Sequence, residues 1–311
     1  MDMYQKREMR KNKKMDEDLN NVSTMNINWY PGHMAKTKRQ IIEDLKLIDI
    51  VIELLDARIP VASRNPDIKS LTKNKKRIII LNKSDLSDEN ENKKWVSKLS
   101  SEAPTILTDS NSGKGVDRIE KEIDKLMEEE RQRQLARGIK NKTIRVMIVG
   151  IPNVGKSSLI NRMVKSKKLV VGNKPGVTKQ KQWIRIGKNQ ELMDTPGVLW
   201  PKFESNEVAL NLSFTGTIKD EILDKVDIAY ELTKILMKDY MDKLCQRYKI
   251  EKEEIEQILK LENSPYELMK LIGRKRGALV AGGNVNDEKV ASIILDDFRT
   301  GRIGKITLEK A

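Results

Sequence analysis

Gly150-Ile151-Pro152-Asn153-Val154-Gly155-Lys156-Ser157 is the stretch that decides the fold of this 311-residue chain. It matches the pattern Gly-x-x-x-x-Gly-Lys-Ser/Thr of phosphate-binding loops. It follows a β-rich apolar run, Thr143 to Val149, and precedes a helix predicted from Lys156 to Met163. A loop between strand and helix suits a phosphate, because the helix presents its positive end to the oxygens that the loop N–H groups surround.

The polar groups of this loop have predicted tasks at a nucleoside triphosphate. The two glycines let the backbone wrap around a phosphate. Lys156 is expected to reach the β- and γ-phosphates, and the Ser157 hydroxyl to ligate Mg²⁺. The other residues of the loop in the predicted nucleotide-binding set are Asn153, Val154, Gly155 and Ser158.

A guanine-reading motif precedes the phosphate loop in the chain. Asn82-Lys83-Ser84-Asp85 directly follows a buried apolar strand that ends at Leu81. The Asp85 carboxylate can accept two hydrogen bonds from the N1–H and N2–H₂ edge of guanine, and adenine offers no such pair of donors. Asn82 can bond the N7 side and the stem of Lys83 can lie over the ring. Ser110, after the next strand, is expected to supply a second guanine loop.

Two further segments have the spacing of γ-phosphate sensors. Asp194-Thr195-Pro196-Gly197 follows a short strand, so Asp194 is expected to hold Mg²⁺ through a water and the Gly197 N–H to sense the γ-phosphate. Thr178 lies between the phosphate loop and this motif. We expect it to close on Mg²⁺ in the GTP state only.

The motifs stand in an unusual order. GTPases usually carry the phosphate loop, switch and DxxG segment before the guanine motifs, and here the guanine motifs come first. A circular permutation explains the order, with the helix predicted from Val116 to Arg137 bridging the old ends. The expected fold is α/β: a circularly permuted P-loop GTPase domain with a mostly parallel sheet and helices on both faces, followed by a small all-α domain.

The chain divides into three predicted parts. Residues 1–24 are a charged tail expected to be disordered. Residues 25–204 form the permuted GTPase domain, and residues 205–311 form a helical domain that binds RNA or the ribosome. The strands are predicted at 48–55, 77–81, 104–107, 143–149, 183–186 and 191–193. The later helices are predicted at 220–238, 242–248, 252–261, 265–272 and 287–300.

Composition narrows the class of partner. The formal net charge is +14 with a pI near 9.5, and such a surplus attracts polyanions. The single cysteine, Cys245, excludes an internal disulfide and a cysteine-rich zinc site. The sequence has no apolar run of the ~18–20 residues that cross a bilayer and no signal core. We therefore expect a cytoplasmic monomer with no membrane partner.

Beyond these motifs the chain resembles the ribosome biogenesis GTPase A family, bacterial circularly permuted GTPases that mature the large ribosomal subunit. The resemblance covers nearly everything from Met25 onward. The residues that carry it, besides the nucleotide motifs, are Trp29-Tyr30-Pro31-Gly32-His33-Met34-Ala35, Asp56-Ala57-Arg58-Ile59-Pro60, Gly282-Gly283 and Gly301-Arg302-Ile303-Gly304.

The resemblance implies a catalytic group and a second cation. Val198 stands where many small GTPases have a water-orienting glutamine, and it cannot hydrogen-bond. The family implies that His33 swings toward the γ-phosphate on the ribosomal precursor and positions the water. It also implies that Asn153 binds K⁺ beside the phosphates, so the expected cofactors are GTP/GDP and Mg²⁺, with K⁺ as a stimulant.

The resemblance implies a partner as well. We expect binding to the precursor of the large (50S) subunit and its rRNA, a late maturation step, and release coupled to GTP hydrolysis. Hydrolysis is expected to be slow until the particle stimulates it. Cations at Arg274-Lys275-Arg276 and Arg299-Thr300-Gly301-Arg302 would meet rRNA phosphates.

The sequence bears on three alternatives. A membrane or tRNA GTPase would share the nucleotide motifs, although no lipidation or amphipathic anchor supports a membrane. A small-subunit permuted GTPase would carry an OB-fold and a zinc site, and the single cysteine excludes the latter. A scaffold that binds GTP without hydrolysing it remains open because of Val198.

Overall fold

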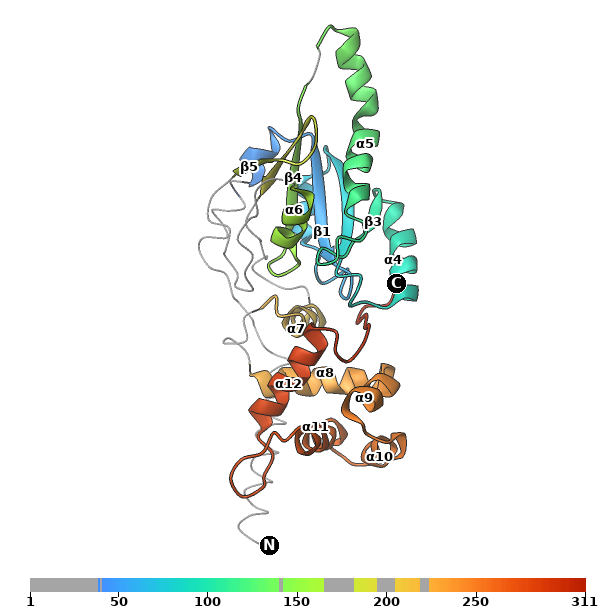
Figure 1. The fold of residues 1–311 in the computed structure, drawn as a ribbon, viewed down its shortest axis with the longest axis vertical. Coiled ribbons are helices and arrows are strands. Elements are labelled where there is room, and N and C mark those ends of the chain that lie inside the picture. The colour runs from blue at the N-terminus through green and yellow to red at the C-terminus, as the bar shows by residue number, and fades with distance from the viewer. Residues whose placement is uncertain (1–38, 40, 140–141, 165–181, 195–204, 219–223) are drawn as a thin grey trace.

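The computed structural model describes the chain except residues 1–38, 40, 140–141, 165–181, 195–204 and 219–223, which are drawn in grey in Figure 1. The side chains of Asp67, Lys69, Gln182 and Asp194 also lie outside the description. The statements below concern the described residues.

A six-stranded sheet forms the first half of the molecule, in the order β3-β2-β1-β4-β6-β5. Every neighbouring pair is parallel except β5 and β6, which form an antiparallel hairpin. The strands are β1 (Ile50–Asp56), β2 (Lys76–Asn82), β3 (Thr105–Leu107), β4 (Ile144–Gly150), β5 (Gln182–Arg185) and β6 (Gln190–Asp194). Strand β1, from the segment before the phosphate loop, lies beside β4 from the segment that carries it, so both segments build one sheet.

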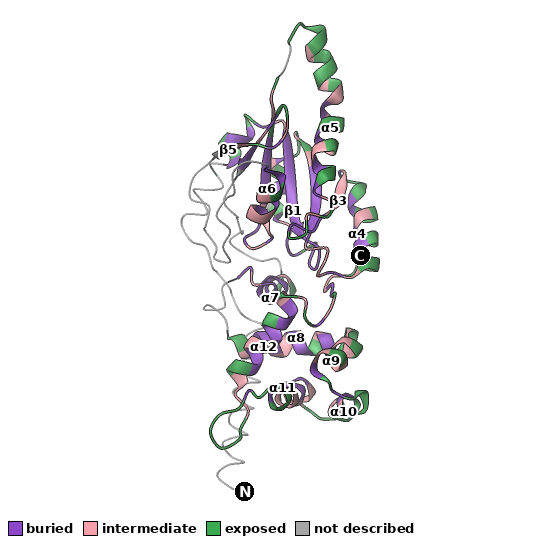
Figure 2. Cartoon of the chain, viewed as in Figure 1, coloured by how far each residue is buried: buried purple, intermediate pink, exposed green. Residues whose placement is uncertain are grey.

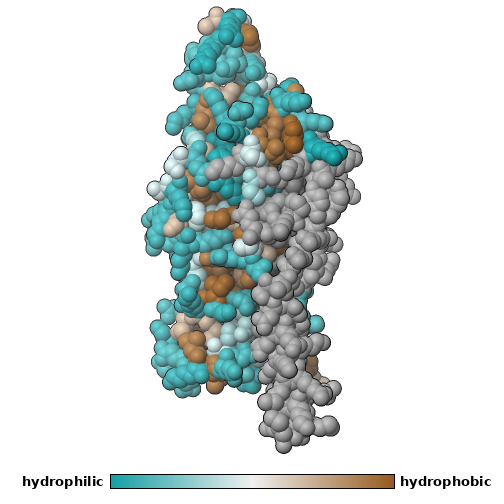
Figure 3. All heavy atoms as spheres, turned by 180° about the vertical axis from the view of Figure 1, so that it is seen from behind, coloured by the Kyte–Doolittle hydropathy of each residue, from teal (hydrophilic) through white to brown (hydrophobic). Residues whose placement is uncertain are grey.

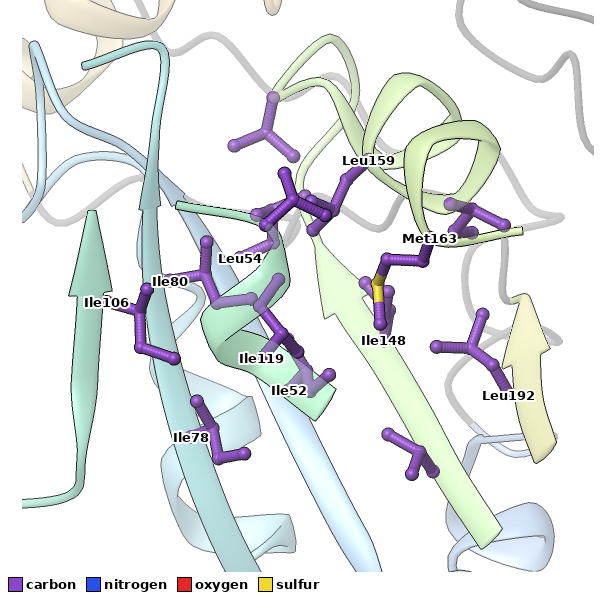
Figure 4. Packing of buried hydrophobic residues seen from close by; sticks show 14 of the residues in the cluster. Ile52, Leu54, Ile78, Ile80, Ile106, Ile119, Ile148, Leu159, Met163 and Leu192 are labelled. Atoms are coloured by element: carbon purple, nitrogen blue, oxygen red, sulfur yellow. The ribbon is translucent and has the colours of Figure 1, made fainter. Parts of the chain in front are cut away.

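Helices cover both faces of this sheet because the central strands are apolar on both sides. On one face, α5 (Asp117–Ala136) and α6 (Lys156–Met163) pack against alternate strand residues such as Ile52 and Ile148. Figure 4 shows Ile119 of α5 and Leu159 of α6 among those strand side chains. On the other face lie residues 41–45, α3 (Pro66–Leu71) and α4 (Glu89–Ser100). Such runs are typical of parallel strands buried on both sides.

The second half is helical and has a core of its own. Its elements are α7 (Asn206–Phe214), α8 (Lys225–Asp239), α9 (Met241–Tyr248), α10 (Lys252–Ile258), α11 (Ser264–Lys275) and α12 (Asp287–Arg299). Buried residues of these helices, among them Phe214, Leu232 and Phe298, form one cluster. In Figure 2 the buried positions of α7, α8 and α12 face each other and the exposed ones face outward. The surface in Figure 3 is mostly hydrophilic, with separate hydrophobic patches.

The predicted α/β class, followed by an all-α part, is confirmed. All six predicted strands occur within two residues of their expected ends, and α6 has the predicted bounds. The sequence analysis missed α3, α4 and α7, and it predicted no strand pairing after Pro201, where Leu279 and Val285 form an isolated antiparallel bridge. The sequence also predicts a helix from Ala35 to Leu47; residues 41–45 are helical, and the predicted start lies outside the described residues.

Helix α4 was missed because its apolar face is narrow. Only Asn92, Trp95 and Leu99 are buried, and the other positions are mostly charged or polar. Its start is marked by Asp88, whose carboxylate accepts from the N–H groups of Asn90 and Glu91. None of the described helices combines the length and the apolar character that a bilayer crossing requires.

Candidate functional site

The site lies at the carboxyl edge of the sheet, where the predicted nucleotide motifs meet. Strands β1, β2, β3 and β4 end there at Asp56, Asn82, Leu107 and Gly150. In parallel sheets the loops after the strand ends build the ligand site. The structure therefore brings the guanine motif, the Ser110 loop and the phosphate loop to one place, although more than 60 residues separate Asp85 from Gly150 in the chain.

Asn82 joins the three loops. Its buried side chain donates from Nδ2 to the Val154 carbonyl at 2.9 Å. Its Oδ1 accepts from the Ser110 hydroxyl at 2.7 Å, from the Ser110 N–H at 3.1 Å and from the Thr108 hydroxyl at 3.1 Å. The expected contact with the N7 side of the base would therefore come from a side chain whose oxygen already holds the second guanine loop, and that contact stays a prediction.

Lys83 connects the same motif to the phosphate loop. Its backbone has φ +60°, in the left-handed region that non-glycine residues seldom occupy. The ammonium Nζ donates to the Asn153 carbonyl at 2.6 Å and lies 3.0 Å from the Asp56 carboxylate. Burial lowers the pKa of Lys83, and the charge of Asp56 opposes that shift. The phosphate loop and the end of β1 thus fix the lysine whose stem was expected to lie over the guanine ring.

Asp56 and Arg58 support Lys83, and the sequence analysis assigned them no role in the site. Arg58 is 1% exposed and donates to both Asp56 carboxylate oxygens, at 3.0 and 2.8 Å. Burial alone would raise the pKa of Asp56, but Arg58 and Lys83 outweigh it and hold that pKa well below its usual range. The sequence signal for this pair was an acidic residue at a strand end, two positions before a basic residue.

Asp85 has the environment expected of a base-reading acid. Its Oδ1 is buried and has no hydrogen-bond partner among the described residues. Burial and the nearby Asp109 carboxylate raise the pKa of Asp85, because both disfavour its charge. A buried acceptor without a donor costs free energy, and a ligand edge with two N–H donors would remove that cost. This oxygen therefore fits guanine.

The phosphate loop has the backbone that an anion cradle needs. Asn153 has φ +61° and Gly155 has φ +96°, so the chain turns twice through the left-handed region. A Cβ at Gly155 would lie 2.3 Å from Asn82 Nδ2, which explains the glycine there. Helix α6 begins at Lys156, with Ser157 and Ser158 in its first turn, so its positive end faces the loop.

The remaining predicted residues are only partly placed. Asp194 ends β6 and pairs in register with Ile148 of β4, so its backbone is next to the strand that leads into the phosphate loop. The Asp194 side chain and the residues Thr178, Gly197 and His33 lie outside the described residues, and their predicted roles are untested.

A contact of the phosphate loop ties the site to the helical half, and a second contact continues it to α12. Asn153 Nδ2 donates to the carbonyl of Gly216, just after α7, at 2.6 Å. Arg299 of α12 donates to the carbonyls of Phe214 and Ser213 at the same helix end, at 3.0 and 2.9 Å. Phosphate loop, α7 and α12 are therefore linked in series.

The C-terminal segment returns from the helical half to the half that contains the sheet. The Glu309 carboxylate accepts from the N–H of Ala62 at 2.9 Å and from Asn211 Nδ2 of α7 at 3.0 Å. Leu308 donates its N–H to the Arg58 carbonyl at 2.9 Å. Burial raises the pKa of Glu309 to about 6 against these hydrogen bonds. The sequence analysis missed this segment because nothing in a short polar tail predicts a distant contact.

Comparison with known proteins agrees with this geometry. The family model described as "50S ribosome-binding GTPase" matches residues 145–270. The chain is 45% identical over 290 residues to "Ribosome biogenesis GTPase A" of Bacillus licheniformis, covering 92% of this chain and 99% of that protein.

Two solved structures of the T. maritima protein YlqF have the same fold. The GDP-bound form has a TM-score of 0.62 at 26% identity, covering 88% of this chain and 99% of that one. The GNP-bound form has a TM-score of 0.60 at 25% identity, covering 88% and 98%. That protein is therefore known in two nucleotide states with the architecture described above.

Proposed function

Because this chain belongs to the ribosome biogenesis GTPase A family and is a GTPase of ribosome biogenesis, we propose that it acts on the precursor of the large (50S) subunit. It binds the particle with GTP, promotes a late maturation step and leaves after hydrolysis. The observation that carries the proposal is the set of hydrogen bonds of Asn82, which join the guanine loops to the phosphate loop in one pocket.

The described residues fit a guanine nucleotide. Asp85 offers its unpartnered Oδ1 to the N1–H and N2–H₂ donors of the base. The backbone from Asn153 to Lys156 surrounds the phosphates, and the lysine neutralises their charge. The Ser110 hydroxyl donates to Asn82, and this bond holds the second guanine loop against the first.

Mg²⁺ is proposed to bind near the start of α6. The Ser157 hydroxyl would be a direct ligand, Asp194 would bind through a water, and Thr178 would join in the GTP state. All three offer oxygen, which Mg²⁺ prefers. When bound, the ion neutralises charge between the β- and γ-phosphates.

Two residues are proposed to serve hydrolysis. His33 would position the attacking water, since Val198 cannot do so. His33→Ala should lower particle-stimulated phosphate release while leaving GDP affinity unchanged, and equal release would remove His33 from the mechanism. Asn153 would contribute its Oδ1 to K⁺, since its Nδ2 is engaged with Gly216. Faster hydrolysis in K⁺ than in Na⁺ buffer would support this role.

The rRNA contact is proposed for the end of α11. Arg274, Lys275 and Arg276 are exposed there, and Lys275 also pairs with Glu254 and Arg276 with Asp297. Arg299, which the sequence analysis grouped with the rRNA-binding cations, is partly buried and is engaged with α7 carbonyls, so we leave it out of this surface. The remaining cluster lies away from the nucleotide loops, and the protein would use one surface for the particle and another for GTP.

Co-sedimentation with 50S-size precursor particles tests this function. The GTP-bound form should pellet with the particles and the GDP-bound form should stay in the supernatant. The pair Arg274→Ala/Lys275→Ala should weaken pelleting and reduce the salt dependence of binding by about 2 in slope. Lys121→Ala/Lys125→Ala on α5 removes the same charge elsewhere and should have no effect. Absence of pelleting in either nucleotide state would contradict the proposal.

A further inference from the structure

A second cavity lies at the opposite edge of the sheet from the nucleotide loops. Its volume is about 350 Å³, within the range of small-molecule sites. It is lined by α5 from Glu120 to Leu135, by residues 142–144 at the start of β4, and by residues 188–190 at the start of β6. Figure 1 shows α5 extending past this edge. Seven-residue strands of about 3.3 Å per residue put the two edges roughly 20 Å apart, so the cavity is separate from the nucleotide site.

Gln190 provides a buried acceptor that no described residue satisfies. The residue is 2% exposed and lines the cavity. Its Nε2 donates to Asp124 Oδ1 at 2.8 Å, which fixes the orientation of the amide because a carboxylate only accepts. The Oε1 atom is buried and has no hydrogen-bond partner among the described residues. Such an atom calls for a further donor, which a ligand N–H group would supply.

Glu120 places a negative charge beside that acceptor. A Cβ built on Gly187 would lie 2.8 Å from Glu120 Oε1 and 3.3 Å from Gln190 Oε1. The two oxygens therefore lie on the same side of Gly187, where a side chain at that position would crowd both of them. The Glu120 carboxylate forms no ion pair or hydrogen bond with any described residue. In a chain of net charge +14, this is an unusual place for an uncompensated acid.

The rest of the lining favours a ligand with a hydrocarbon part. Met127 and Ile144 line the cavity with apolar side chains. Asp124 and Glu128 lie one and two turns beyond Glu120 on α5, and Glu128 is paired with Arg131 at 2.7 Å. Two converging oxygens suit the N–H groups of an ammonium, whereas Mg²⁺ or Ca²⁺ would require about six oxygens.

We propose that this cavity binds an alkylammonium group. The ammonium nitrogen donates to Glu120 Oε1 and Gln190 Oε1. Its aliphatic stem lies along Met127 and Ile144. The ammonium comes either from a free diamine or from a lysine side chain of a protein partner, and both sources share the chemistry that the cavity recognises.

Calorimetric titration of the full, nucleotide-free chain tests the site. The probes are 1,4-diaminobutane for a free amine and Nα-acetyl-lysine methylamide for a protein side chain, with 1,4-butanediol as the uncharged control. At least one amine should bind saturably, one per chain, and the diol should not bind. Preference for one probe identifies the source. Failure of both amines to bind would overturn the proposal.

Matched variants separate this cavity from general charge effects. Glu120→Gln removes the charge, and Gly187→Ala places a methyl group against Glu120 Oε1 and Gln190 Oε1, so each should weaken amine binding at least tenfold. Glu122→Gln removes the same charge two residues along α5 and should bind as the wild type does. Equal affinity in all three variants, or equal loss in all three, would contradict the assignment. GDP affinity, measured in each variant, should stay unchanged, so failure here leaves the nucleotide site intact.

Discussion

Asn153 in the phosphate loop donates a hydrogen bond of 2.6 Å to the carbonyl of Gly216, the residue that follows the end of α7. A side chain at the phosphates thus bonds directly to the helical half. Arg299 of α12 bonds to the same end of α7, so a movement of the phosphate loop would pass to α12 through two hydrogen-bonded steps. This relationship connects the phosphates to α12, which contacts α11, the helix whose end is proposed to meet the ribosomal particle.

Substitutions at Asn153 separate this contact from a role in K⁺ binding. Asn153→Asp keeps an oxygen for the cation but loses the N–H donor to Gly216, and Asn153→Ala loses both. Both variants should show faster amide hydrogen exchange at residues 206–217 in the GDP-bound protein. Stimulation of hydrolysis by K⁺ should survive only in Asn153→Asp. Unchanged exchange in both variants would show that the contact does not hold α7.

Gly155 tests the close approach of the two swapped segments. Gly155→Ala should lower GDP affinity at least about tenfold, because a Cβ would meet Asn82 Nδ2 at 2.3 Å and the left-handed backbone is strained for alanine. Gly277→Ala is the matched control, since Gly277 also has positive φ but has no atom within 4 Å of the added carbon. It should bind GDP as the wild type does. Similar affinity in both variants would argue against the close packing of Asn82 on the phosphate loop.

The buried pair of Asp56 and Arg58 should be sensitive to loss of one partner. Arg58→Met should lower the free energy of unfolding by about 3 kcal/mol, because it leaves the buried Asp56 charge with Lys83 as its remaining partner. The double variant Asp56→Asn/Arg58→Met should lose less than the sum of the single variants. Urea denaturation measures all three. Additive losses would mean that the two charges do not interact.

Glu309 should make stability depend on pH. Its folded pKa of about 6 lies above the ordinary value of 4.5, so the folded state binds the proton more tightly than the unfolded state. The stability from this group is present below the unfolded pKa and is lost as pH rises through about 6, to a total of about 2 kcal/mol. Glu309→Gln removes this titration. Denaturation curves of both proteins between pH 4.5 and 7 should therefore differ in slope, and parallel pH profiles would contradict the raised pKa.

The strands and the phosphate loop could be predicted because their signals are local. A run such as Ile78 to Leu81 is apolar at every position. The glycine spacing of Gly150–Ser157 by itself predicts a loop that wraps around a phosphate. Asp56, Arg58 and Glu309 could not be predicted as supports of the site, because their partners are distant in sequence or become partners only after burial. Helix α7 was missed for a related reason, since nearly all its faces are covered and no polar stripe marks it.

The central claim is that one guanine pocket is assembled from two segments in swapped order. Calorimetric titration of the wild type and Asp85→Asn with GDP, ADP and xanthosine diphosphate tests it most directly. The wild type should bind GDP and not ADP. Asp85→Asn should lose GDP affinity by about 100-fold or more and gain affinity for the xanthosine nucleotide, whose O2 accepts where guanine donates. Equal binding of GDP and ADP by the wild type, or no binding of either, would contradict the account.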